Sequence, residues 1–141
     1  MREEKKAPTR PLPRLTELDT AEFWRATKGK EFRYQQCSNC QTIVWHPRAH
    51  CTGCVESNLQ WQTSAGQGVI YTYSIVRLSY HPFFRGMAPY AVAYVDLDEG
   101  PRFLTNVVGV EDPGTEVHIG QRVQLYWEEH EELSIPLVTP V

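Results

Sequence analysis

Apolar and polar residues alternate along the second half of the chain in the manner of half-buried β-strands. Five segments there are rich in Val, Ile, Tyr, Leu and Thr: residues 68–78, 91–97, 103–110, 123–127 and 133–138. Turn residues separate them, as at residues 98–101. Five such strands predict a small closed barrel of the OB type, with a β-sandwich as the alternative. Pro136 predicts an edge position for the last strand, because proline cannot donate a backbone hydrogen bond.

A short helix is predicted between Asp19 and Gly29. Asp19 is a suitable N-cap, Glu22 stands three residues later as in a capping box, and Leu18 is placed to pack on Phe23. Gly29 ends the helical pattern. A helix of this length is not stable alone, so Phe23 and Trp24 must be buried against the body of the domain or against a partner subunit.

Three short strands are predicted around the cysteines. Phe32 and Tyr34 alternate with charged residues, residues 42–45 form a second strand that Pro47 stops, and Leu59 and Trp61 mark a third. The order strand, Cys-x-x-Cys, strand, Cys-x-x-Cys, strand is the arrangement of a metal-binding ribbon.

All four cysteines lie in two Cys-x-x-Cys pairs, at Cys37, Cys40, Cys51 and Cys54. Each pair can chelate one ion, and two pairs complete the tetrahedral four-thiolate shell that Zn²⁺ prefers. Asn39 and Gly53, inside the two knuckles, fit turns that can require positive φ. Iron in a rubredoxin-like site and a redox dithiol pair remain as alternatives. A shell of four thiolates leaves no open position for substrate, so the site is predicted to be structural.

The length of 141 residues fits one domain with a small metal-stabilised appendage. We divide it into a flexible basic, proline-rich arm (1–14), an N-terminal helix and first strand (15–36), a zinc ribbon (37–63) and an OB-fold barrel (64–141). No apolar run approaches the roughly 20 residues of a membrane span, and no signal-peptide pattern is present. Reduced, metal-bound cysteines suit a reducing compartment, so a cytoplasmic protein without membrane contact is expected.

The charge is distributed unevenly. Residues 1–14 hold five basic and two acidic side chains, a balance of +3, and the net charge of −3 therefore leaves −6 on residues 15–141. An acidic body is unfavourable for binding a phosphate backbone. The acidic run around His130, which includes Glu128, is interpreted as a solvated hairpin turn.

The motifs along the chain occur in a specific order. They are Phe23-Trp24, the four cysteines, Gly66-x-Gly68-x-Ile70-Tyr71-x-Tyr73, Pro89-Tyr90-Ala91-Val92-Ala93, Leu97-Asp98-Glu99-Gly100 and Leu104-Thr105-Asn106. Together they resemble the acyl-CoA-associated OB-fold family, whose members carry a rubredoxin-like zinc ribbon. The resemblance implies a protein that lies beside a thiolase-superfamily enzyme and assists chemistry on CoA thioesters. It transfers only the four cysteines, since the family offers no universal catalytic residue.

An unusually apolar connection follows residue 78. It carries a set of residues typical of protein interfaces: Tyr80, His81, Phe83, Phe84, Arg85 and Met87. If the connection is extended, Phe83 and Phe84 face opposite sides and one ring is exposed. We therefore expect this connection, with Phe23 and Trp24, to contact a partner or substrate. The alternative is that the rings cap the barrel.

No catalytic motif is found in the sequence: neither a nucleophile elbow nor a phosphate loop, dinucleotide fingerprint or His-Glu-x-x-His pair occurs. The expected function is an accessory subunit that docks on a thiolase-like enzyme and helps to bind or turn over an acyl-CoA, such as a steroid side-chain ester undergoing retro-aldol cleavage. One alternative is a module that binds single-stranded nucleic acid, because ribbons and OB-folds are combined there and exposed aromatics stack on bases. A self-contained CoA-thioester enzyme is the other.

Overall fold

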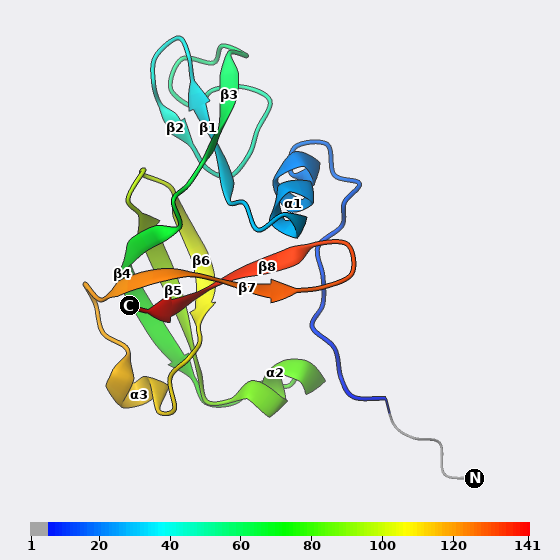
Figure 1. The fold of residues 1–141 in the computed structure, drawn as a ribbon, viewed down its shortest axis with the longest axis vertical. Coiled ribbons are helices and arrows are strands. Elements are labelled where there is room, and N and C mark those ends of the chain that lie inside the picture. Colours follow the sequence, from blue (N-terminus) through cyan, green and yellow to red (C-terminus); the bar gives the residue numbers. More distant parts are fainter. Residues whose placement is uncertain (1–5) are drawn as a thin grey trace.

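The protein is described by a computed structural model that covers residues 6–141; residues 1–5 of the expected arm lie outside the described part. The first elements are α1 (Ala21–Lys28), β1 (Arg33–Cys37), β2 (Ile43–Val44) and β3 (Leu59–Thr63). The three strands form an antiparallel sheet in the order β2-β1-β3. Figure 1 shows this ribbon at one end of the molecule, with α1 beside it and the barrel at the other end.

The second part is a closed barrel in the order β4-β5-β6-β8-β7. Its strands are β4 (Gln67–Val76), β5 (Tyr90–Leu97), β6 (Arg102–Val107), β7 (Arg122–Glu129) and β8 (Ser134–Pro140). Helix α2 (Pro82–Met87) connects β4 to β5, and α3 (Pro113–Glu116) lies between β6 and β7. All neighbours are antiparallel except β6 and β8. The predicted mainly β architecture, with a short helix, a ribbon and a five-stranded barrel, is confirmed.

Alternation along the barrel strands produces the core. In β5, the side chains of Ala91, Ala93, Val95 and Leu97 are buried, and those between them are not. Gly68 in β4 lies so close to β5 that a Cβ atom there would collide with the backbone of Asp96. The strand pattern in the sequence therefore translates directly into one packed interior.

Aromatic rings join α1, the ribbon and the barrel into one core. Phe32 lies at the start of the ribbon, and its ring is 5.1 Å from that of Phe23 in α1, 5.0 Å from that of Trp45 and 4.9 Å from that of Phe103 in β6. Phe23 also contacts Trp45 edge to face at 5.1 Å. Such ring pairs add about 0.5 to 1.5 kcal/mol each beyond the burial of their area. The ribbon is thus fixed to the barrel by side chains.

The helix begins later than the sequence indicates. Its N-cap is Thr20, which makes no side-chain capping bond, and Leu18 is 96% exposed, so the predicted capping box and the Leu18–Phe23 contact are wrong. Glu22 instead accepts a hydrogen bond from Arg33 at 2.6 Å. The burial of Phe23 decides where this helix lies and where it begins. That packing outweighs the local preference for a cap at Asp19. The predicted end at Gly29 is confirmed.

Strand β8 is internal, which corrects its prediction as an edge strand. It lies between β6 and β7 and closes the barrel. Thr105 of β6 donates its hydroxyl to the carbonyl oxygen of Pro136 at 2.7 Å. The backbone N of Pro136 therefore faces β6 as well, where the registered pairing is limited to Val107 and Val138. The missing N–H of Pro136 is tolerated because few backbone hydrogen bonds form between β8 and β6.

Candidate metal centre and interaction surfaces

The four cysteine sulfurs converge at the tip of the ribbon. They lie within 4.8 Å of one another, with Sγ–Sγ distances of 3.6 Å for Cys37 and Cys54 and 3.5 Å for Cys40 and Cys51. None of the four cysteines is paired in a disulfide. A tetrahedral zinc site with bonds of about 2.3 Å places neighbouring sulfurs about 3.8 Å apart. The predicted ligand set is therefore brought together in a geometry suited to one metal ion.

Two knuckles with the same backbone pattern hold these sulfurs. The N–H of Gln41 bonds to the carbonyl of Cys37 at 2.9 Å, and the N–H of Val55 bonds to that of Cys51 at 3.0 Å. Gln41 and Val55, each directly after a pair, have φ values of 65° and 68°. The left-handed residues are therefore these two, and neither Asn39 nor Gly53 has this conformation. Gly53 is required for space, since a Cβ there would lie 2.6 Å from the Thr42 hydroxyl.

Hydrogen bonds favour the ionised form of two of the four sulfurs, those of Cys40 and Cys51. The Thr42 hydroxyl lies 3.0 Å from the Cys40 sulfur and lowers the pKa of that thiol to about 6. The backbone N–H of Cys54 lowers the pKa of Cys51. At Cys37 a backbone hydrogen bond from Cys40 lowers the pKa, but burial and the neighbouring thiols outweigh it and raise the pKa to about 11. Thiolates are the form that binds metal. With four of them the shell is full, so the centre can support the ribbon but offers no position for a substrate.

The apolar connection after β4 contains a helix. His81 is the N-cap of α2, with its Nδ1 accepting from the N–H of Phe83 at 3.2 Å. Arg85 donates to the carbonyl of Tyr80 at 2.9 Å. Phe83 and Phe84 therefore do not face opposite sides: their rings meet edge to face at 5.1 Å and both are half-buried. The prediction that one of these two rings is exposed is wrong, because the connection is helical here and not extended. The exposed aromatic residue of the connection is Tyr80, whose exposed fraction is 83%.

Arg10 covers these two rings, which the sequence analysis did not predict. Its guanidinium carbon lies 4.8 Å from the ring centroid of Phe83 and 5.4 Å from that of Phe84. It donates two hydrogen bonds to the carboxylate of Glu128, at 2.6 and 3.0 Å. The arm residue Arg10 is thus anchored to β7 and α2, and Glu128 does not belong to a merely solvated turn. A contact between residues 118 positions apart leaves no local pattern in a sequence.

Phe23 and Trp24 differ in their environments. Phe23 is buried in the core, whereas Trp24 is half-buried and lines an apolar pocket of about 150 Å³ between α1, the ribbon and the barrel. Leu104 of β6, 54% exposed, lines the same pocket. Trp24 is thus the member of the pair that can reach the surface.

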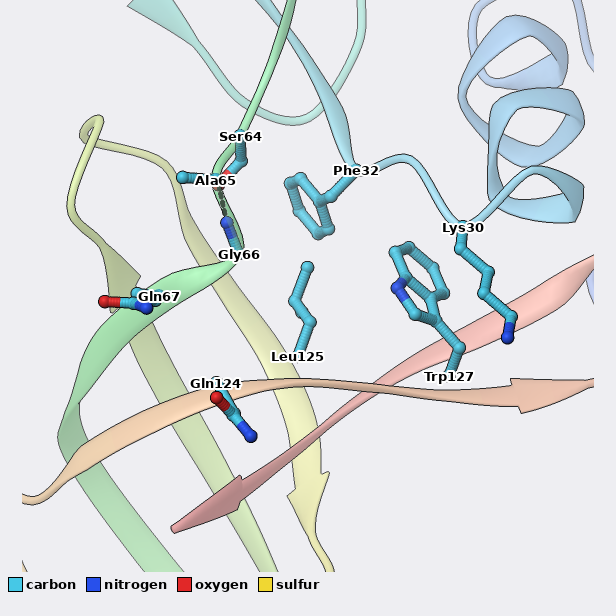
Figure 2. Close-up of a pocket in the computed structure, with 9 residues that line it drawn as sticks. All are labelled: Lys30, Phe32, Ser64, Ala65, Gly66, Gln67, Gln124, Leu125 and Trp127. Atoms are coloured by element: carbon cyan, nitrogen blue, oxygen red, sulfur yellow. Dashed lines mark hydrogen bonds between the residues drawn. The ribbon is translucent and has the colours of Figure 1, made fainter. Parts of the chain in front are cut away.

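A more polar pocket of about 310 Å³ lies where the ribbon joins the barrel. Figure 2 shows Leu125 and Trp127 projecting from β7 toward Phe32, with Lys30 beside Trp127. Ser64 on its wall bonds to the carboxylate of Glu99 at 2.6 Å. Among the described residues that line this pocket there is no Cys, His, Asp or Glu, and its polar side chains are those of Lys30, Ser64, Gln67 and Gln124. Sequence reasoning missed this pocket because its walls come from distant segments.

Comparison with known proteins gives consistent matches. Residues 24–60 match the family model of the ChsH2 rubredoxin-like zinc ribbon domain, and residues 61–128 match that of the ChsH2 C-terminal OB-fold domain. A solved structure described as the Ltp2-ChsH2(DUF35) aldolase superposes with a TM-score of 0.80 at 34% identity, covering 93% of this chain and 98% of that one. The chain belongs to the ChsH2 (DUF35) family.

Two curated relatives carry different descriptions. A probable enoyl-CoA hydratase alpha subunit of Thermomonospora curvata is 35% identical over 98% of this chain, and a DUF35 domain-containing scaffold protein of Methanocaldococcus jannaschii is 31% identical over 63%. The chain spans 42% and 62% of their respective lengths. No helix in residues 6–141 is long and apolar enough to cross a membrane.

Proposed function

We propose that this protein is a zinc-containing accessory subunit that docks on a thiolase-superfamily enzyme in the cytoplasm and assists the binding or turnover of an acyl-CoA thioester. The observation that carries the proposal is the match to the ChsH2(DUF35) chain of an aldolase, which extends over 98% of that chain. The scaffold description of other relatives supports an organising role.

The reaction that fits is retro-aldol cleavage of a CoA ester, with a steroid side chain as a candidate acyl group. Cleavage of a β-hydroxyacyl thioester requires a base that removes the hydroxyl proton and a group that stabilises the enolate left on the thioester. These groups belong to the partner enzyme in the proposal, and this chain contributes docking and the shape of the site.

Zinc is the metal that we assign to the four-cysteine centre. Sulfurs 3.5 to 3.6 Å apart fit one tetrahedral ion, zinc or iron alike. The match to a family described as a zinc ribbon supports zinc over iron. Elemental analysis of the purified protein should give about one zinc per chain. A red protein with visible thiolate-to-iron absorption would contradict the assignment.

Docking is tested by co-expression with thiolase-like proteins of the source genome and with the Ltp2 chain of the related aldolase, followed by size exclusion. Stoichiometric co-elution with one of them is expected. Tyr80→Asp should weaken the complex, because Tyr80 is 83% exposed beside α2. Ile119→Asp, a change at a residue 65% exposed beyond α3, is the matched control. If this protein elutes separately from every candidate partner with which it is co-expressed, the proposal fails.

Nucleic-acid binding is the second candidate, and one surface favours it. Tyr71 and Tyr94 are about half-exposed, and Arg102 stacks on Tyr71 at 3.5 Å. Arg102, however, is already paired with Asp96 at 2.6 Å, which neutralises the cation that would contact a phosphate. A chain beginning at Leu15 should therefore show no measurable affinity for single-stranded DNA or RNA at physiological salt. Sub-micromolar binding would reverse the order of the two candidates.

A further inference from the structure

The site of Arg10 is built like a recognition site for a guanidinium group. Its side chain is 8% exposed, and it meets one carboxylate, two aromatic rings and the sulfur of Met87 at 3.9 Å. A bidentate carboxylate selects the planar fork of arginine over the point charge of lysine, and aromatic faces attract the same cation. We name the group formed by Glu128, Phe83, Phe84 and Met87 the arginine cradle.

The arm that carries Arg10 is attached at this one point. Among residues 6–14, Arg10 alone forms side-chain hydrogen bonds or ion pairs in the described structure, and no backbone hydrogen bond holds these residues. In Figure 1 the segment runs from α1 past the end of the β7–β8 hairpin toward α2. A segment held by a single side chain can detach without unfolding anything else.

The cradle can survive the departure of Arg10. The Glu128 carboxylate also bonds to His130 Nε2 at 2.7 Å, so it keeps a partner when the guanidinium leaves. Phe83 and Phe84 contact each other, and Phe84 also contacts Tyr90 at 5.9 Å. Opening a buried ion pair usually costs free energy because one charged group is left without a partner. Here the hydrogen bond to His130 avoids that cost. Arg10 also lines a groove of about 290 Å³ with Phe84, Tyr90 and Leu104, so its release enlarges an apolar surface.

We infer that the arginine cradle is an exchangeable binding site, filled by Arg10 in the free protein and by an arginine-bearing segment of the partner enzyme in the complex. The inference rests on the proposed function for the identity of the second occupant. Charge and shape complementarity specify that occupant: a guanidinium that fits between two phenyl rings and a carboxylate. Residues 6–14 then act as an internal competitor that shields α2 until the partner binds.

The first experiment uses the free protein and needs no partner. ¹⁵N relaxation and the ring resonances of Phe83 and Phe84 are measured for the wild type, for Arg10→Ala and for Arg14→Ala. Arg14 is exposed and has the same charge, so it is the matched control. Arg10→Ala should make residues 6–14 mobile and shift both rings, while Arg14→Ala should do neither. A rigid arm in Arg10→Ala would overturn the inference.

Titration then tests the chemistry of the emptied cradle. N-acetylargininamide added to the Arg10→Ala variant should return the Phe83 and Phe84 resonances toward their wild-type positions, and N-acetyllysinamide should do so far less. The additional change Glu128→Gln should abolish the response to arginine. An equal response to both amides, or none to arginine, would show that no arginine site exists.

The last measurement is the affinity for the co-eluting thiolase-like partner. Removing the competitor in Arg10→Ala should tighten binding by about tenfold relative to wild type and to Arg14→Ala. An unchanged or weaker affinity would refute exchange at this site. If no candidate binds even the wild type, the proposed function and its second occupant both fail, whereas the arginine titration still decides whether the cradle is a guanidinium site.

Discussion

Phe32 and Phe103 pack ring against ring with their centroids 4.9 Å apart, and this contact joins the base of the ribbon to the barrel. Phe32 is 1% exposed and also contacts Phe23 and Trp45. The metal centre stabilises the tip of the ribbon, whereas this cluster fixes how the ribbon, the helix and the barrel are placed. Any surface that a partner recognises across these parts depends on it.

Phe32→Ala should lower the free energy of unfolding by about 3 to 5 kcal/mol, because it leaves a cavity between three rings. Urea denaturation followed by tryptophan fluorescence measures the change. Leu18→Ala, at a residue 96% exposed, is the control and should stay within about 0.5 kcal/mol of wild type. Equal effects of the two substitutions would show that the aromatic cluster does not join the two parts.

Cys37→Ser should remove the metal and loosen the ribbon while the barrel remains folded. Cys37 is completely buried, and metal binding supplies folding free energy of order 10 kcal/mol in small zinc sites. Elemental analysis and amide hydrogen exchange measure the two effects. Ser38→Ala, in the same knuckle but without a ligand atom, should retain full metal content. If the barrel amides also lose their protection against hydrogen exchange, the barrel depends on the ribbon for its stability.

Gly68→Ala and Gly86→Ala should have opposite effects. A Cβ at Gly68 would collide with the backbone of Asp96 in β5, so the substitution should destabilise the protein by about 1 to 3 kcal/mol. Gly86 lies in α2 with no atom within 4 Å of such a Cβ, and alanine there should be neutral or stabilising by up to about 1 kcal/mol. Thermal unfolding of both variants provides the comparison.

The contribution of Glu128 to stability should disappear in acid. Burial raises the pKa of Glu128, but the hydrogen bonds from Arg10 and His130 outweigh it, and the pKa is lowered overall. A lowered pKa in the folded protein means that the stabilisation is present above the pKa of the unfolded chain and is lost as the pH falls through the folded value. Wild type and Glu128→Gln should therefore differ in stability at neutral pH and converge in acid.

The control for this pH dependence is Glu132→Gln, an exposed change on the same hairpin. Its stability in urea titrations should stay within about 0.5 kcal/mol of wild type, as for other exposed substitutions. If the difference in unfolding free energy between wild type and Glu128→Gln stays constant down to strongly acidic pH, Glu128 has no ionic role.

Local spacing in the sequence determined the metal centre and the class of the fold. Two residues between cysteines place both sulfurs on one turn, so Cys37, Cys40, Cys51 and Cys54 could be assigned before any tertiary contact was known. Alternation of apolar residues likewise predicted the barrel strands, since side chains in a strand alternate between two faces whatever the neighbouring strand is.

Only the tertiary structure decided the remaining features, because they depend on residues distant in the chain. The capping signal at Asp19 was overridden when burial of Phe23 placed the helix. Pro136 lies in an internal strand. This is possible because its backbone N, which carries no hydrogen, faces β6, and the pairing between β6 and β8 is short.

The arginine cradle shows the same limit most clearly. Arg10 in a proline-rich arm and Glu128 in an acidic run each fit a solvated segment, and nothing within either stretch indicates the other. Their contact spans 118 positions and exists because closure of the barrel brings the end of β7 beside α2. Local patterns record which backbone conformation and which face a residue favours, but the meeting of two distant side chains depends on the packing of the whole chain.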